Sequence, residues 1–134
     1  MRQGHRIHAV AGRFCHVFSG GPVAVSSPQG RFDDGDALLD GLTFIGASAW
    51  GKHLFVEFER ERWLNVHLGL IGKFSVMRHH LDPDPERPGM PAGHVPVEGQ
   101  VRVRLLNDTW VGDLRAPTVC AVVTPEKVDQ IQAR

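Results

Sequence analysis

Two short runs of β-forming residues, separated by four charged residues, constrain the fold of this 134-residue chain more than any other feature. The runs are residues 54–58 (LFVEF) and 63–67 (WLNVH), and both are rich in the aromatic and β-branched side chains that favour strands. The charged residues 59–62 (ERER) between them are expected at an exposed turn, because burying them without partners would be costly. The sequence therefore predicts an antiparallel β-hairpin.

Cationic side chains at one end of this hairpin give it a candidate function. Lys52 and His53 stand where the hairpin begins, His67 stands where it ends, and residues 69–72 (GLIG) and Lys73 follow. This arrangement suits a protein that grips an anionic polymer and inserts an apolar turn into it. It is also compatible with an ordinary β-domain, because the strands of any sheet can carry a Lys and a His at their ends. The pattern alone leaves both interpretations open.

Size and charge indicate one globular domain without overall basic character. The apolar fraction of 42% and the charged fraction of 22% are typical of such a domain, and 134 residues suffice for one core. Lys plus Arg and Asp plus Glu each number 15, so the formal net charge is zero. Dedicated nucleic-acid binders are usually basic, so any contact with DNA must come from local clustering of cations.

Neither a metal centre nor a membrane anchor is expected. Cys15 and Cys120 are far apart in the sequence, lie among apolar residues and belong to no C-x-x-C motif, which favours buried free thiols over a zinc site. No motif for a cofactor is present. No apolar run approaches the roughly 20 residues needed to span a bilayer, and no signal peptide is visible. These features predict a cytoplasmic protein.

The remaining sequence predicts a helix at each end of a series of strands. Apolar residues recur at helical spacing over residues 4–18, forming the stripe Ile7, Val10, Ala11, Phe14, Cys15 and Phe18. Thr124 followed by Pro125 is a helix-start signal, so a second helix is expected up to Arg134. Strands are expected at 22–28, 43–49, 54–58, 63–67, 74–78, 100–106, 109–112 and 119–123.

Three segments are expected to be irregular. Residues 29–41 are rich in turn formers, residues 113–118 break the strand pattern, and residues 79–99 contain five prolines and read as a mobile loop outside any sheet. Arg102 and Arg104 alternate with apolar residues and are expected on a basic outer face of their strand. The predicted class is α+β: an antiparallel β-sandwich or flattened barrel with an N-terminal helix and a C-terminal helix.

Five sequence blocks, in order and together spanning essentially the whole chain, resemble a known family. They are residues 1–8 (M-x-x-GH-x-IH), 26–32 (SSPQGRF), 50–55 (WGKHLF), 66–74 (VHLGLIGKF) and 113–118 (DLRAPT). Any one block is a weak signal, but five in register are specific. The chain resembles the amino-terminal domain of the formamidopyrimidine-DNA glycosylase / endonuclease VIII family, and is most similar to the endonuclease VIII-like members of actinobacteria.

The resemblance implies a DNA-repair enzyme: a bifunctional DNA glycosylase and abasic-site lyase of base excision repair, acting on oxidised bases. The family folds as an amino-terminal β-sandwich, a helix-two-turn-helix domain and usually a zinc finger, with DNA in the cleft between the halves and the damaged nucleotide flipped out. Residues 1–134 correspond to the β-sandwich, so we expect the other domains to be absent. Double-stranded DNA with oxidised bases or abasic sites is then a weak partner, and the uncovered cleft wall is expected to pair with a separate carboxy-terminal partner or to self-associate. The resemblance implies a nucleoid-associated location in the cytoplasm.

The family motif assigns DNA contacts to particular residues of this chain. Lys52 matches the lysine beside the catalytic pocket that contacts the phosphate of the damaged nucleotide, and His67 matches a histidine that donates to a phosphate. Leu70, with Ile71 beside it, matches the apolar wedge that fills the space left by the flipped base. Arg115 matches the arginine that reaches the orphaned opposite base. The alternatives are a solvated strand end for Lys52, a structural role for His67, and core packing for Leu70 and Ile71.

The same motif includes Lys73 as a DNA contact, and the chain departs from the motif at three positions. Pro117 stands where many members carry a wedging Phe, so recognition of the opposite base differs here. Arg2 replaces the proline whose secondary amine attacks the sugar, and Gln3 replaces the glutamate that acts as acid and base. Neither replacement can perform the covalent step. We therefore expect an inactive member; the alternatives are a non-catalytic DNA-binding or scaffold relative, or a truncated product.

Overall fold

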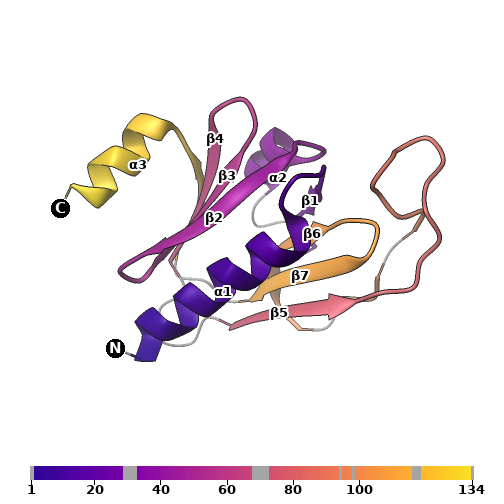
Figure 1. Ribbon diagram of the computed structural model, residues 1–134, viewed down its shortest axis with the longest axis horizontal. Helices are drawn as coiled ribbons and strands as arrows, with labels where there is room; N and C mark the ends of the chain where they lie inside the picture. Colours follow the sequence, from indigo (N-terminus) through magenta and orange to yellow (C-terminus); the bar gives the residue numbers. More distant parts are fainter. Residues whose placement is uncertain are drawn as a thin grey trace.

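The chain forms two four-stranded antiparallel sheets that share one core (Figure 1). The computed structural model describes residues 2–28, 33–67, 73–93, 95–97, 99–115 and 119–133. The strand orders are β1-β6-β7-β5 and β2-β3-β4-β8. The elements are α1 (Arg2–Phe18), β1 (Ala24–Ser26), α2 (Asp33–Leu39), β2 (Phe44–Trp50), β3 (His53–Phe58), β4 (Arg62–His67), β5 (Lys73–Arg78), β6 (Val101–Leu106), β7 (Trp110–Arg115), β8 (Val119–Val123) and α3 (Pro125–Gln132). The predicted α+β class, a β-sandwich with a helix at each end of the described chain, is confirmed.

The apolar stripe of α1 builds the centre of the core. Val10 and Phe14 have no exposed surface, and Phe14 packs edge-on against Phe18 with ring centroids 5.6 Å apart. Phe18 in turn contacts Phe44 of β2, and Phe44 contacts Phe58 of β3, at 5.9 and 5.8 Å between centroids. This row of aromatic rings joins the helix to the sheet, because each ring buries its apolar surface against the next.

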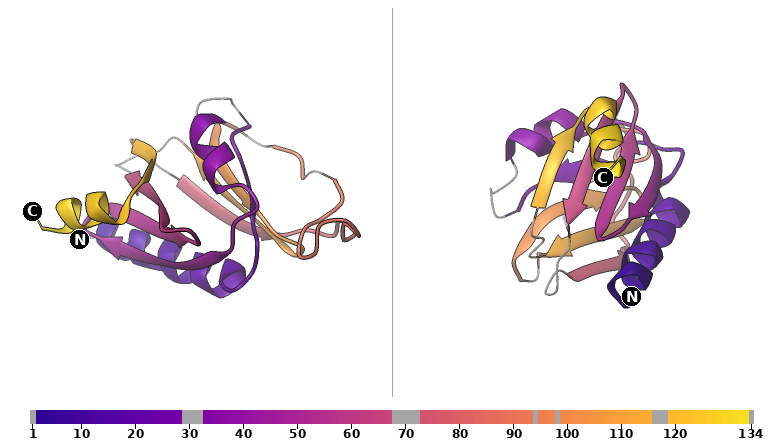
Figure 2. Two further views of the ribbon diagram at one scale, coloured as in Figure 1. Left: turned by 90° about the horizontal axis from the view of Figure 1, so that it is seen from above. Right: turned by 90° about the vertical axis from the view of Figure 1, so that its left-hand side faces the viewer.

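A cysteine holds α1 against the edge of its sheet. The Cys15 thiol donates to the backbone oxygen of Ala47 at 3.2 Å and accepts from the Ala47 backbone nitrogen at 3.1 Å. β2 is the edge strand, so these bonds satisfy backbone groups that no neighbouring strand can reach. Figure 2 shows α1 lying along this sheet in both views. Cys15 and Cys120 are both free, as expected from the sequence, but each is half-buried where full burial was expected.

The predicted hairpin is confirmed as β3 and β4. Leu54 pairs with Val66 and Val56 pairs with Leu64, and all four side chains are fully buried on the inner face. The alternating residues therefore lie on the other, outer face of this sheet, where His53, Phe55 and Glu57 of β3 stand opposite His67, Asn65 and Trp63 of β4. Phe55 and Asn65 are buried on this face as well.

Two segments that were expected to be irregular are regular. Residues 33–39 form the short helix α2, whose Leu39 is fully buried, although glycines around it had suggested only turns. β7 continues through Asp113 to Arg115 instead of ending at Gly112. The strand tolerates Asp113 because a buried partner, Arg104, satisfies its carboxylate.

Arg104 lies on the outer face of β6, as expected, but it does not form part of an exposed basic surface. Its side chain is only 6% exposed, since it forms an ion pair with Asp113 at 2.7 Å between Nε and Oδ1. Arg102 remains half-buried. A cross-strand carboxylate and the backbone oxygens of Val95 and Pro96 therefore bury one of the two alternating arginines on the outer face.

The proline-rich segment 79–99 lies outside both sheets, as expected, but its described residues fold back on themselves. Pro83 and Pro91 form an isolated antiparallel bridge. Its hydrogen bonds come from the flanking residues, Asp84 N–H to Met90 O at 2.9 Å and Ala92 N–H to Asp82 O at 2.7 Å, so the bridge needs no proline N–H. Met90 is 3% exposed and holds the base of the loop against the domain.

The predicted second helix is confirmed as α3. Thr124 is its N-cap, and the Lys127 backbone N–H donates to the Thr124 hydroxyl at 3.2 Å, with Pro125 in the first helical turn. Val128 is buried, and the helix contacts β4. In the described part of the chain, no helix has the length and apolar character needed to cross a membrane.

Candidate functional site

The ends of both sheets that carry the predicted site residues meet at one end of the sandwich. In one sheet His53 pairs with His67, and His67 pairs with Val119 at the start of β8. In the other sheet Lys73, at the start of β5, pairs with Arg115, at the end of β7. Three residues separate Arg115 from Val119, so these two strand ends lie within about 14 Å of each other.

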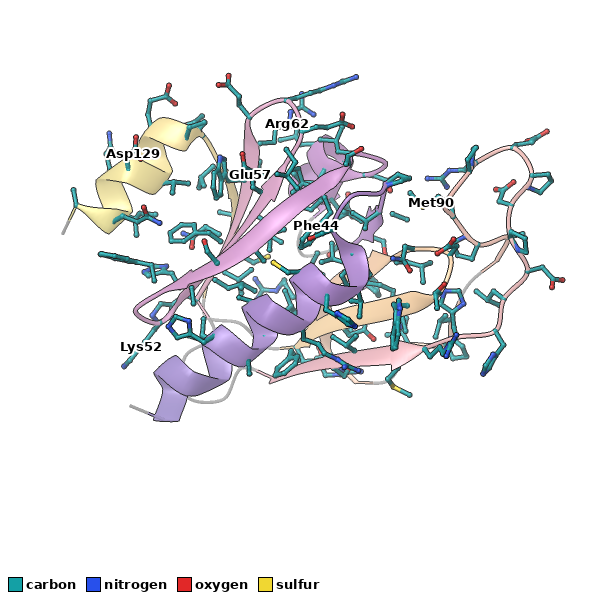
Figure 3. The ribbon with its side chains drawn as sticks, viewed as in Figure 1. Phe44, Lys52, Glu57, Arg62, Met90 and Asp129 are labelled. Atoms are coloured by element: carbon teal, nitrogen blue, oxygen red, sulfur yellow. The ribbon has the colours of Figure 1, made fainter. Side chains whose placement is uncertain are left out.

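The amino-terminal end of α1 lies at this same end. Cys15 contacts the middle of β2 and the Gly20 N–H donates to the first residue of β2, so α1 runs antiparallel to that strand. The first turn of α1 therefore lies near the β2–β3 turn, which carries Lys52 (Figures 1 and 3). The backbone of Arg2 and Gln3 opens α1 at this point.

Some of the predicted site residues cannot be placed. Leu70, Ile71 and Pro117 lie outside the described residues, and so do the side chains of Arg2, Gln3 and Lys73. The described part of the site consists of Lys52, His53, Asn65, His67 and, on the second sheet, Arg115 with its neighbours.

A two-residue turn presents Lys52 to solvent. Trp50 pairs with His53, leaving Gly51 and Lys52 as the loop, and Gly51 adopts a φ of 57°. Glycine is favoured at this first position because a side chain would be strained at positive φ. Lys52 is exposed, and its side chain projects from the turn (Figure 3). Its ammonium group is therefore available to an anion.

Two histidines and an asparagine lie beside this turn on the outer face of the sheet. His53 Nδ1 lies 3.0 Å from Asn65 Oδ1, and Asn65 is only 5% exposed. The rings of His53 and His67 pack edge to face with centroids 4.9 Å apart. An amide oxygen can only accept, so His53 carries a proton on Nδ1. Asn65 thus fixes the orientation of the His53 ring.

The environment of His67 sets where its proton lies. Its Nδ1 atom is buried and has no hydrogen-bond partner among the described residues. A buried N–H without an acceptor would be costly, so neutral His67 carries its proton on Nε2. Burial lowers the pKa of His67, and the positive charges of His53 and Lys52 lower it further. The site thus pairs one lysine cation with one neutral imidazole donor.

This lowered pKa predicts a pH dependence of stability. Because the pKa of native His67 lies below its value of 6.5 in the unfolded chain, the unfolded state binds more protons between the two values. The free energy of unfolding should therefore fall as the pH drops from above 6.5 through the native pKa. Urea unfolding at about pH 8 and about pH 5 measures this loss.

The matched variants are His67→Gln and His8→Gln, since His8 is an exposed histidine on α1. His67→Gln should lose less stability on acidification than the unmodified chain, whereas His8→Gln should follow the unmodified chain. Equal acid sensitivity of the His67 variant and the unmodified chain would contradict the assignment.

Arg115 lies on the outer face of the second sheet with two side-chain partners. One guanidinium nitrogen donates to Ser75 Oγ at 2.8 Å, and the other lies 3.5 Å from Asp113 Oδ2. The side chain remains 23% exposed. Asp113 also accepts two bonds from Arg104, at 2.7 and 2.9 Å.

Sequence reasoning assigned no function to Asn65, Ser75 or Asp113. Hairpin register could have placed Asn65 on the same face as His67, because the two are two residues apart on one strand. No local signal links Ser75 to Arg115, since they lie 40 residues apart in the sequence. Among the described residues, no group of three or more His, Cys, Asp and Glu side chains could hold a metal ion.

Sequence comparison assigns this chain to a family. The family described as "Formamidopyrimidine-DNA glycosylase N-terminal domain" matches residues 2–118. The curated protein "Endonuclease 8 1" of Mycobacterium tuberculosis is 39% identical over 137 residues, covering 100% of this chain and 47% of the relative, and that of Mycobacterium bovis matches equally. The chain thus spans about half the length of the curated relatives it matches.

Solved structures share the fold. Formamidopyrimidine-DNA glycosylase of Lactococcus lactis, in a structure non-covalently bound to DNA with an abasic site, matches with a TM-score of 0.70 at 18% identity, covering 93% of this chain and 46% of that chain. The same enzyme in complex with DNA containing FAPY-dG gives a TM-score of 0.69 at 16% identity, covering 93% and 45%. With the family match over residues 2–118, these findings show that the chain belongs to the formamidopyrimidine-DNA glycosylase / endonuclease VIII family as its N-terminal domain.

Proposed function

We propose that this chain grips the backbone of double-stranded DNA at an oxidised or abasic nucleotide, without the covalent chemistry of its family. The observation that carries the proposal is the meeting of Lys52, His67 and Arg115 near the start of α1. An exposed ammonium, an imidazole N–H and a guanidinium can all donate to phosphate or base oxygens, and two of the three carry a positive charge.

The relatives support DNA as the partner. The Lactococcus structures contain DNA with an abasic site or a FAPY-dG lesion, and the mycobacterial relatives are named endonucleases. This chain, a β-sandwich with flanking helices, covers 46% of the Lactococcus protein and 47% of the mycobacterial one. In the proposal, Lys52 and His67 bind phosphates, Lys73 adds a further cation, and Leu70 with Ile71 fills the space left by a flipped nucleotide.

The residues at positions 2 and 3 favour binding without catalysis. Arg2 offers no secondary amine for attack on the sugar, and the Gln3 amide cannot exchange a proton as an acid or base. The relatives are about twice as long as this chain. We propose that the opposing wall of the DNA cleft comes from polypeptide outside these 134 residues.

The test is salt-dependent binding to a duplex that contains an abasic-site analogue. The affinity should fall steeply as salt rises, because phosphate contacts release counterions. Lys52→Ala should weaken binding by about five- to tenfold and lower the salt slope by about one, as expected for one lost phosphate contact. Fluorescence anisotropy over a series of salt concentrations measures both quantities.

Arg87→Ala is the matched control for Lys52→Ala. Arg87 is exposed and lies on the proline-rich loop, which extends away from the candidate site (Figure 1). Its removal changes the net charge equally but should leave affinity nearly unchanged. Binding that does not respond to salt, or equal effects of the two variants, would contradict the proposed grip and indicate a protein partner instead.

A further inference from the structure

A buried carboxylate anchors Arg115 at the edge of the candidate site. Asp113 is 5% exposed, and both of its oxygens accept from Arg104 in a two-pronged contact. Arg104 also donates to the backbone oxygens of Val95 and Pro96, so it links the end of the proline-rich loop to β7. Because Asp113 is held on one side by this buried pair, it offers Arg115 a fixed position on the other.

Arg115 is contacted from three directions on this face. Ser75 of β5 accepts from one guanidinium nitrogen, Asp113 lies beside the other, and Gly99 lies along the side chain. A Cβ atom at Gly99 would come within 3.5 Å of the Arg115 Nε, so the backbone there approaches the arginine closely. These contacts restrict the rotamers of a side chain that would otherwise lose much entropy on binding.

We propose that Ser75 and Asp113 are positioning residues that hold Arg115 ready to contact DNA at the damaged base pair. The inference rests on the proposed function and deepens it. One carboxylate between two guanidiniums leaves a net positive charge on this face, so Arg115 still attracts an anionic strand. Ser75 and Asp113 hold the two terminal nitrogens of the guanidinium group, and the 23% of the side chain that stays exposed leaves DNA access to this oriented group. Preorganisation of this kind raises affinity, because less ordering remains to be done on binding.

Ser75→Ala tests the proposal without disturbing the buried pair. Binding is measured to four duplexes that carry an abasic-site analogue opposite each of the four bases. Loss of the Ser75 contact should weaken binding by about three- to tenfold and reduce the preference among the four opposite bases. Ser75→Thr keeps the hydroxyl and should restore both. Ser48→Ala, at an exposed serine on β2, is the matched control and should change neither.

A double-mutant cycle with Arg115→Ala separates positioning from a general structural role. If Ser75 acts through Arg115, then Ser75→Ala should have no further effect on affinity once Arg115 is alanine. The inference would be overturned if the effects of the two substitutions on affinity were additive. It would also be overturned if Ser75→Ala bound DNA as tightly as the unmodified chain, or more tightly. None of these outcomes would affect Lys52-dependent binding. Failure of the unmodified chain to bind any of the duplexes would overturn the proposed function and this inference together.

Discussion

Borohydride trapping on an abasic-site duplex should give no covalent complex with this chain, and a clear complex once Arg2→Pro and Gln3→Glu are introduced together. Trapping requires an amine that forms an iminium with the sugar, and a carboxyl group that moves the proton. The present start supplies only a primary α-amine and, at Gln3, no carboxyl group. Acid–base assistance alone is worth about 10²- to 10⁴-fold in rate, so the contrast between the two proteins should be large.

The comparison is sharpest when the other half of the cleft is supplied. The unmodified chain and the double variant can each be fused to the carboxy-terminal half of the 39% identical mycobacterial relative. In both fusions the amine of residue 2 is the free terminus. Gln3→Glu alone is the control, because it restores the carboxyl group without the secondary amine. If the unmodified chain gave a trapped complex in equal yield, Arg2 and Gln3 would be able to perform the covalent step. Absence of a complex from the double variant would show that differences elsewhere block the chemistry.

The elements that could be predicted from the sequence are those whose pattern is local. The stripe on α1 and the alternation in β3 and β4 each reflect one face buried against the core, so periodicity alone identified them. Thr124 and Pro125 marked the start of α3 for the same reason, since capping involves only the first turn.

The features that sequence reasoning missed depend on partners distant in the chain. The strand was expected to end at Gly112, with Asp113 as the first residue of an irregular segment. Arg104, nine residues away on the neighbouring strand, supplies the compensating charge. α2 is stabilised by burial of Leu39, which no local signal announces. In both cases tertiary contacts override local preference.

The residues of the candidate site also fall into those that the sequence predicted and those that it did not. The motif pointed to Lys52, His67 and Arg115, and the pairing of strands brings their backbones to one end of the sandwich. The residues that orient them, Asn65 and Ser75, could not be found from the motif, because their roles come from cross-strand register and from pairing between distant segments.

Asp113→Leu should lower the free energy of unfolding by about 3–5 kcal/mol, the usual cost of breaking a buried ion pair from one side. The variant leaves the Arg104 guanidinium buried, with its side chain only 6% exposed and its carboxylate partner gone. The charge cannot be neutralised at ordinary pH, because arginine stays protonated. Urea unfolding followed by circular dichroism at neutral pH measures the change.

The double variant Arg104→Met, Asp113→Leu distinguishes an unpaired charge from a general loss of packing. Replacing both partners by apolar side chains removes the buried charge, so most of the stability lost in Asp113→Leu should return. The Val95 and Pro96 carbonyls that Arg104 binds lie on the half-buried to exposed loop, where water can replace the guanidinium. A double variant as unstable as Asp113→Leu would instead mean that the pair holds the loop and β7 in place through its hydrogen bonds. Asp113 has two roles: it neutralises Arg104, and it positions Arg115. If the double variant recovered stability but not the preference among opposite bases, the two roles would be separated, because only the positioning of Arg115 requires the carboxylate.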